Sequence, residues 1–357
     1  MLPKKFGSFL RAAKMRFLRF LTLASSLSRP DVPENVAGSV IIARVVGNDL
    51  FPRHGKGQML TNLRFILEHE PNFTDVTKLF ILNRLTDANE QKEAQRLIAE
   101  YGHEVLVLPF VADEYAALGW NLEPFGSLDF FTSPEFYSHG FQSQMRKKIL
   151  ACRPKINYAM NVNGARNAAI KAGRKVAEWT VVLDGSCIFS AASFKRFYAD
   201  SKTLPFTPYK IIPMHRLEEN EDYKNSSREP ESSEEPQIAF HCLARYQFDE
   251  RFPYGFRDKT SLLNSLGVLG PWRRWENPPW APIESNKMTD KYRYRYTSGV
   301  VLRLSSGAKR LDGQKSHRER YSARNTAILT TIAQLNKIYG TLDDHVTDIV
   351  TSTLDKS

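Results

Sequence analysis

Three places in the sequence carry residues that could bind a phosphorylated ligand. Asp184 ends an apolar run at residues 179–184 and is followed by glycine and serine. Arg166 and Asn167 lie in a helical stretch earlier in the chain, and Asp258 follows an aromatic segment later. A carboxylate is a preferred ligand of Mg²⁺ and Mn²⁺, and a guanidinium binds phosphate through two parallel hydrogen bonds. These residue types point to a phosphate or metal contact.

Each of these residues also has an ordinary structural explanation, which the sequence leaves open. Asp184 could cap a turn, and Arg166 with Asn167 could be a helix cap and a surface charge. Asp258 could be the N-cap of a helix at 259–266, because aspartate is favoured at that position. The choice depends on whether the fold brings these distant residues together.

The elements that must position them alternate between strands and helices. Apolar runs closed by turn residues predict strands at 39–46, 78–83, 104–109 and 179–184. Helical spacing predicts helices at 59–68, 89–101 and 157–177. This alternation predicts an α/β fold with a mostly parallel sheet flanked by helices.

Ligands of such sheets bind outside the carboxyl ends of the strands. The segments expected to meet on that rim are 47–49, 84–87, 109–114 and 184–186. Arg44 and Asn48, at the end of the first strand, are therefore candidates for nucleotide contact. Residues 53–57 mix arginine and lysine with glycine, but they lack the full P-loop pattern.

Two segments resemble the family 2 glycosyltransferases of the GT-A fold. In that family a helix begins Ala-Arg-Asn, as at 165–167, and a later strand ends in an Asp-x-Asp motif, as at 184–186. The resemblance implies that Arg166, Asn167 and Asp184 bind a nucleotide-sugar. It also implies that Asp184 and Ser186 hold Mg²⁺ or Mn²⁺.

The resemblance covers residues 39–270 and adds two further site residues. Asp87 lies where the family's second strand ends in a Ser-Thr-Asp turn, which implies a nucleotide-sugar contact. Residues 248–258 are similar to a segment of galactosyltransferase-like enzymes whose final aspartate acts as a general base or anchors the acceptor. That likeness implies a catalytic role for Asp258.

The sequence departs from the family pattern at two points. Ser186 replaces the second acid of Asp-x-Asp, and a hydroxyl is a much poorer cation ligand than a carboxylate. Arg257 replaces the glutamate that precedes the final aspartate. Three possibilities stay open: Asp184 holds the metal with phosphate and water, arginines replace part of the metal, or activity has been lost.

The net charge of +11 is spread unevenly along the chain. Residues 1–36 form a basic amphipathic segment and linker, which is typical of a helix lying on an anionic membrane surface. A plain surface helix or tail and a targeting peptide are the alternatives. Three scattered cysteines indicate reduced thiols in the cytoplasm. Together these features predict a cytoplasmic protein, peripheral at the cytoplasmic face of the inner membrane.

The expected domain organisation has a GT-A-like nucleotide-sugar and acceptor domain at 37–306 and a helical C-terminal extension at 307–357. Within the domain, residues 218–236 are rich in acids and predict a mobile, solvated loop without chemistry. Residues 272–296 are basic and aromatic, a composition that suits phosphate or an anionic acceptor.

The function that this sequence predicts is glycosyl transfer from a nucleotide-sugar donor to a glycan or glycolipid acceptor, as in polysaccharide biosynthesis. The alternative is a catalytically inactive GT-A-like protein that binds a nucleotide-sugar or polysaccharide as a regulator or scaffold. Nucleic-acid binding has only the overall charge in its favour, because no recognition helix or zinc site is apparent.

Overall fold

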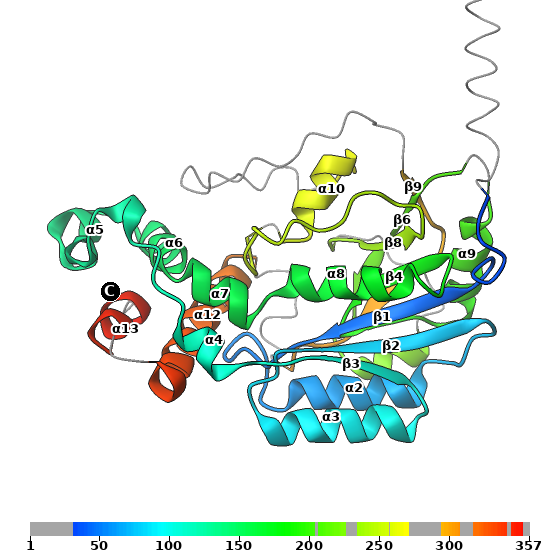
Figure 1. The fold of residues 1–357 in the computed structure, drawn as a ribbon, viewed down its shortest axis with the longest axis horizontal. Helices are drawn as coiled ribbons and strands as arrows, with labels where there is room; N and C mark the ends of the chain where they lie inside the picture. The colour runs from blue at the N-terminus through cyan, green and yellow to red at the C-terminus, as the bar shows by residue number, and fades with distance from the viewer. Residues whose placement is uncertain are drawn as a thin grey trace, which may run out of the picture.

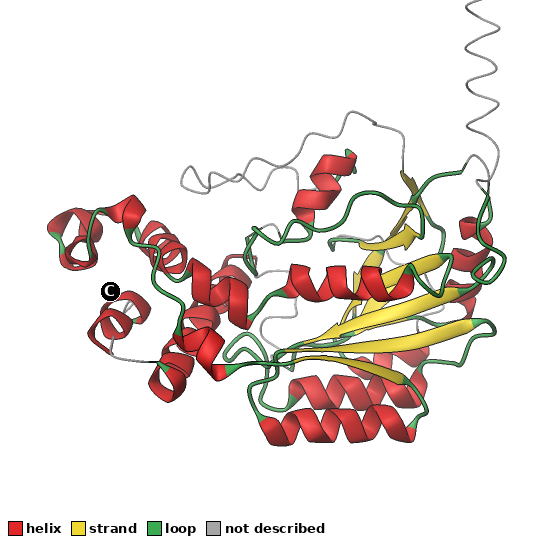
Figure 2. Ribbon diagram, in the orientation of Figure 1, coloured by secondary structure: helices red, strands yellow, loops and turns green. Residues whose placement is uncertain are grey.

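The computed structural model describes residues 31–203, 206–225, 234–256, 258–270, 294–307, 317–340 and 344–352. They form a seven-stranded sheet, a three-stranded sheet and helices that cover both faces of the larger sheet (Figures 1 and 2). The predicted α/β fold with a mostly parallel sheet is confirmed. Residues 1–30 of the predicted membrane-surface segment lie outside the described residues.

One antiparallel strand interrupts the large sheet. Its spatial order is β3 (Glu104–Leu108), β2 (Val76–Asn83), β1 (Val40–Val46), β4 (Trp179–Asp184), β8 (Gln237–His241), β6 (Tyr209–Ile212) and β9 (Tyr294–Tyr296). Strand β8 runs antiparallel to both of its neighbours, whereas the other pairs are parallel. The small sheet has the order β5 (Cys187–Ile188), β10 (Val301–Arg303) and β7 (Met214–Arg216).

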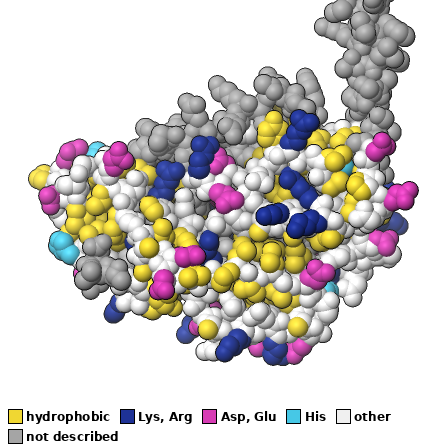
Figure 3. Space-filling model, in the orientation of Figure 1, with side chains coloured by type: hydrophobic (Ala, Val, Ile, Leu, Met, Phe, Trp, Pro, Cys, Tyr) yellow, Lys and Arg dark blue, Asp and Glu magenta, His cyan; other side chains and the backbone are white. Residues whose placement is uncertain are grey.

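Helices sandwich the parallel part of the sheet. Helix α8 (Val162–Gly173) lies on one face near α10 (Thr260–Leu266), and α2 (Gln58–His69) and α3 (Ala88–Glu100) lie on the other (Figure 1). Exposed basic side chains gather over α8 (Figure 3). A Cβ at Gly173 would lie 2.1 Å from Thr180 Oγ1, so glycine lets α8 pack closely against β4. Helix α9 (Ala191–Ser201) shares a further core with Val40 and Trp179.

A separate helical region lies beside the carboxyl ends of the strands (Figure 1). It contains α4 (Ala112–Ala116), α5 (Pro134–Ser138), α6 (Phe141–Ala151), α7 (Arg153–Ala159), α12 (His317–Tyr339) and α13 (Asp344–Thr351), with 3-10 turns at Glu123–Phe125 and Leu128–Thr132. Residues from the middle and the end of the chain share one apolar core there. The predicted C-terminal helices therefore pack with residues 112–159. No described helix is both long and apolar enough to cross a membrane.

Two buried polar side chains hold the C-terminal helices in that core. Lys148 donates from Nζ to the carbonyl oxygen of Ile349 at 2.8 Å, in the last turn of α13. Tyr115 donates from its hydroxyl to Asn336 Oδ1 at 2.8 Å. Because an unpaired buried polar group is costly, these bonds fix how α13 and α12 dock.

The acidic segment at 218–236 packs at both of its described ends, although its middle, 226–233, lies outside the described residues. At the first end, in a 3-10 turn at Asn220–Asn225, the Tyr223 hydroxyl donates to the carbonyl oxygens of His69 and Phe189 at 3.2 Å. At the second end, Glu234 and Glu235 line a cleft. These ends thus differ from the solvated loop that the composition predicted.

Candidate functional site

A cleft of about 690 Å³ opens between the sheet and the helical region. Residues 45–50, at the end of β1 and just after it, and residues 184–186, at the end of β4 and just after it, line the sheet side. Arg146, Arg153 and Arg324 belong to the helical side. This is the carboxyl-end rim that the strand pattern predicted. Of the four segments expected there, 84–87 and 109–114 are not among the lining residues.

The turn after β4 brings Asp184 into the cleft. A Cβ at Gly185 would lie 2.6 Å from the carbonyl oxygen of Val45, so only glycine allows the chain to cross so close to β1. Strands β1 and β4 are in parallel register, with Val45 opposite Asp184. The Asp-Gly pair therefore places this carboxylate at the end of a buried strand.

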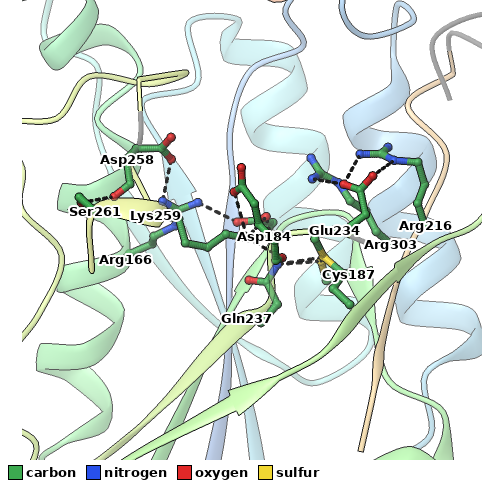
Figure 4. Close-up of polar contacts among 12 residues, drawn as sticks. Arg166, Asp184, Cys187, Arg216, Glu234, Gln237, Asp258, Lys259, Ser261 and Arg303 are labelled. Carbon is green, nitrogen blue, oxygen red and sulfur yellow. Dashed lines mark hydrogen bonds and ion pairs between the residues drawn. The ribbon is translucent and has the colours of Figure 1, made fainter. Parts of the chain in front are cut away.

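Arg166 joins the two aspartates that the sequence singled out (Figure 4). Its Nη2 donates to Asp184 Oδ1 at 2.9 Å, and its Nη1 donates to Asp258 Oδ2 at 2.8 Å. Asp184 Oδ2 accepts from Gln237 at 3.1 Å and from Lys259 Nζ at 3.3 Å. We call Arg166, Asp184, Asp258 and Lys259 the cleft ion cluster.

The cleft ion cluster is shielded from water without being closed. The side chains of Arg166 and Lys259 are 5% and 3% exposed, whereas Asp184 and Asp258 are 19% and 17% exposed. Burial by itself would raise the pKa of Asp184, but the charges of Lys259 and Arg166 hold that pKa well below its usual range. In the neighbouring Glu235, burial prevails and raises the pKa of the carboxyl. Asp184 is therefore ionised at neutral pH.

Two asparagines of α8 hold the Asp258 segment in place. Asn163 donates to the backbone carbonyl oxygens of Asp249 and Asp258, both at 2.8 Å. Asn167 donates to the carbonyl oxygen of Phe248 at 2.9 Å and accepts from its amide at 3.0 Å. Sequence reasoning missed Asn163, although the spacing 163, 166 and 167 puts all three side chains on one helical face.

Asn48 and Asp87 support the rim locally. Asn48 donates to the Arg84 carbonyl oxygen at 2.8 Å and accepts from the Thr86 amide at 2.9 Å, which ties the ends of β1 and β2 together. Asn48 also lines the cleft. Asp87 accepts from the amides of Asn89 and Glu90 and is the N-cap of α3, away from the cleft lining.

Arg44 lies away from the cleft, in a second group of charges. Its Nη2 pairs with Glu70, and its Nε donates to the Cys187 carbonyl oxygen at 2.9 Å. Lys78 Nζ lies 3.4 Å from Glu70 Oε2. Arg44 and Glu70 are fully buried and Lys78 is nearly so. We call Arg44, Glu70 and Lys78 the sealed ion cluster. Arg44 therefore lies outside the cleft, where its nucleotide contact was predicted.

Asp258 is not the N-cap of the following helix. Helix α10 begins at Thr260 after the cap residue Lys259, and the Asp258 carboxylate pairs with Arg166 instead. Of the carboxylate's two oxygens, Oδ1 has no hydrogen bond from the part of the chain that the structure describes.

Four arginines from four distant parts of the chain also meet in the cleft: Arg53, Arg216, Arg303 and Arg324. We call them the arginine cluster. Glu234 is their acidic neighbour, with Oε1 and Oε2 each 3.2 Å from Arg216 nitrogens and Oε2 4.0 Å from Arg303 Nη1 (Figure 4). Sequence reasoning missed this cluster because no motif links its members; only the fold brings them together.

The groups that surround Asp184 do not fit a bound divalent cation. Both carboxylate oxygens already accept hydrogen bonds, and two of the three donors are the cationic groups of Arg166 and Lys259. Ser186 lines the cleft but contributes only a hydroxyl. Among the described residues there is no group of three or more His, Cys, Asp or Glu that could hold a metal ion.

Comparisons with known proteins give distant likenesses only. No family model and no curated protein matches the chain. Among solved structures, a mannosyltransferase from Pyrobaculum calidifontis, in complex with GDP-Man and Mn²⁺, is 13% identical with a TM-score of 0.37, over 94% of this chain and 75% of that chain. Mouse xyloside xylosyltransferase 1, in its apo form, is 10% identical with a TM-score of 0.28, over 58% of this chain and 67% of that chain. Likenesses this low transfer no ligand and no residue role.

Proposed function

We propose that this protein is a glycosyltransferase that moves a sugar from a nucleotide-sugar donor to a glycan or glycolipid acceptor. The observation that carries the proposal is the single guanidinium of Arg166, which joins Asp184 and Asp258 at the strand-end cleft. The two aspartates are 74 positions apart in the sequence, and the resemblance assigned them to donor binding and to catalysis. Their convergence on one cation supports one shared site.

The proposed chemistry is a direct displacement at the sugar. The acceptor hydroxyl oxygen forms a bond to the anomeric carbon while the bond from that carbon to the diphosphate oxygen breaks. The electron pair of the broken bond leaves with the nucleoside diphosphate, and the proton of the acceptor hydroxyl passes to Asp258 Oδ1. Arg166 acts as a positioning residue, because it holds the other oxygen of Asp258 at 2.8 Å.

A panel of nucleotide-sugars tests this function, with thermal shift reporting donor binding and release of nucleoside diphosphate reporting turnover. The Asp258→Asn variant should keep donor binding and lose about 100-fold or more in turnover, because it removes the general base. Asp249→Asn is the matched control, since Asp249 lies in the same segment but pairs with Arg251 at 2.6 Å outside the cleft lining.

The possible outcomes separate the two hypotheses that the sequence left open. Turnover by wild type and by Asp249→Asn, with loss in Asp258→Asn, supports the transferase. Donor binding without turnover in any variant selects the catalytically inactive binding protein. No thermal shift and no turnover with any nucleotide-sugar would exclude the transferase and a nucleotide-sugar-binding protein, and would leave only polysaccharide binding. Attachment to a membrane surface through residues 1–36 and a cytoplasmic location remain proposals of the sequence alone.

A further inference from the structure

The cleft offers more positive charge than its own acids balance. Among the described residues, seven arginines and five acidic residues line it. Burial raises the pKa of Asp49 to about 6 and also raises that of Glu235, so both acids lose their negative charge more readily than an exposed carboxylate. Buried charges are normally paired, since desolvation costs several kcal/mol per ion in proteins. A cleft with this imbalance is suited to an anionic ligand.

Arg53 shows where that ligand has room to bind. It is 3% exposed, it lines the cleft, and its Nη1 has no hydrogen-bond partner in the described part of the chain. Burial, followed by the charge of Arg303, lowers its pKa to about 10, so it stays charged at neutral pH. Arg324 likewise has a buried Nε–H that donates to no described residue.

An unpaired nitrogen does not by itself mark a site, because Arg44 Nη1 is also unpaired. Arg44 differs in two respects that matter. Its guanidinium pairs with Glu70, and it does not line the cleft. Arg53 lines the cleft beside other arginines, so its unpaired donor and the surrounding repulsion both favour an incoming anion.

We propose that the arginine cluster binds the diphosphate of the donor and supplies the positive charge that the family resemblance assigns to a divalent cation, so that binding needs no added metal. The inference rests on the proposed function and deepens it. Guanidinium groups bind phosphate oxygens in pairs without a metal. The cations beside Asp184 also argue against a metal there, because they already occupy the oxygens that a metal would use.

Calorimetry with inorganic pyrophosphate, on full-length protein stripped with EDTA, tests the inference without depending on turnover. Pyrophosphate should bind in EDTA, and added Mn²⁺ or Mg²⁺ should not be required. Orthophosphate, UDP and GDP titrated in parallel distinguish a general phosphate site from a diphosphate site. The inference predicts tighter binding of all three diphosphates than of orthophosphate, because two phosphoryl groups contact more of the cluster.

Substitution of Arg53 separates ligand binding from a structural role. Arg53→Met should weaken pyrophosphate binding by about 10-fold or more, because a charge-assisted pair is lost. The same change should raise the melting temperature of the free protein, because it removes a buried charge and relieves the repulsion between Arg53 and Arg303. Arg96→Met removes one exposed arginine of α3, 53% exposed, and should leave pyrophosphate binding unchanged. If Arg53→Met does not fold, Arg53→Lys should still bind several-fold more weakly.

Several results would overturn the inference. These are pyrophosphate binding that needs Mn²⁺ or Mg²⁺, no pyrophosphate binding at all, orthophosphate binding as tight as pyrophosphate binding, and unchanged affinity in Arg53→Met or, where that variant does not fold, in Arg53→Lys. A lower melting temperature of Arg53→Met with unchanged affinity would assign Arg53 to the fold. The proposed function and this inference can fail separately. Pyrophosphate binding in EDTA without glycosyl transfer would contradict the function and support the inference. Metal-dependent transfer without pyrophosphate binding in EDTA would support the function and contradict the inference.

Discussion

The sealed ion cluster and the cleft ion cluster begin one residue apart on paired strands, yet they have different surroundings. Arg44 lies opposite Leu183, and its neighbour Val45 lies opposite Asp184. Successive side chains of a strand point to opposite faces of the sheet. Arg44 therefore reaches Glu70 at the end of α2, whereas Asp184 reaches Arg166 on α8. A position near the end of a strand does not by itself put a residue in the site. The face of the sheet on which its side chain lies decides this.

The two clusters also differ in what covers them. Glu70 is fully buried and accepts from the Phe189 amide at 2.9 Å as well as pairing with Arg44, so the sealed cluster has no outlet to water. Asp184 and Asp258 keep 19% and 17% exposure at the cleft. We infer that the first cluster serves stability and the second serves ligand chemistry.

The largest expected effect comes from breaking the sealed cluster. Glu70→Gln should lower the free energy of unfolding by about 3–5 kcal/mol, because it leaves the charges of Arg44 and Lys78 buried without their partner. Urea unfolding measures the loss. Glu68→Gln is the matched control, since that glutamate is 53% exposed and should change stability by less than about 0.5 kcal/mol. A loss below about 1 kcal/mol in Glu70→Gln would contradict the assignment.

Breaking the cleft ion cluster should affect turnover more than stability. Arg166→Gln is expected to lower turnover of the donor identified by the panel by about 100-fold, because Asp184 and Asp258 lose their common positioning cation. The stability loss should be smaller than in Glu70→Gln, since both carboxylates retain access to water. Steady-state kinetics and urea unfolding on the same preparations measure both quantities. A variant with wild-type turnover and a large stability loss would mean that Arg166 serves stability, as the sealed ion cluster does, and not turnover.

The stability advantage of wild type over the Asp184→Asn variant should depend on pH. The charges of Lys259 and Arg166 overcome the effect of burial and hold the folded-state pKa of Asp184 below its ordinary value of 3.8. The ionised carboxylate therefore contributes stability above pH 3.8, and that stability is lost as the pH falls through the lower folded-state pKa. The difference in unfolding free energy between wild type and Asp184→Asn should shrink in acid. A difference that is constant from neutral pH into acid would refute the pairing.

Asp49 should show a small pH effect of the opposite sign. Burial raises its folded-state pKa from 3.8 to about 6, although the amide of Met59 donates to it at 2.9 Å. The folded state therefore holds a proton that the unfolded state releases, and stability falls as the pH rises from about 4 to 6. Because Asp49 is partly exposed, we expect a loss of only about 1 kcal/mol, absent in Asp49→Asn. Equal pH dependence in both proteins would count against the raised pKa.

Local residue order was enough to predict most elements that form the cleft. The apolar run before Asp184 became β4, and the pairing of strands as a mostly parallel sheet followed from the alternation with helices. Arg166 and Asp258 were recognisable because each lies in a segment with a pattern of its own. The antiparallel β8 was not predicted, since pairing direction depends on where the chain returns to the sheet.

The sequence by itself predicted most of the strands and helices around the cleft, because strand and helix periods are local properties of the chain. It also singled out five residues that line the cleft: Asn48, Arg166, Asp184, Ser186 and Asp258. Only the tertiary structure decided that Arg166 bridges two aspartates, that Arg44 is sealed on the opposite face, and that Arg53 joins other arginines. The physical reason is that charge pairing is a matter of distance in space. Residues far apart in the sequence acquire partners, or a shared ligand, only when burial brings them together.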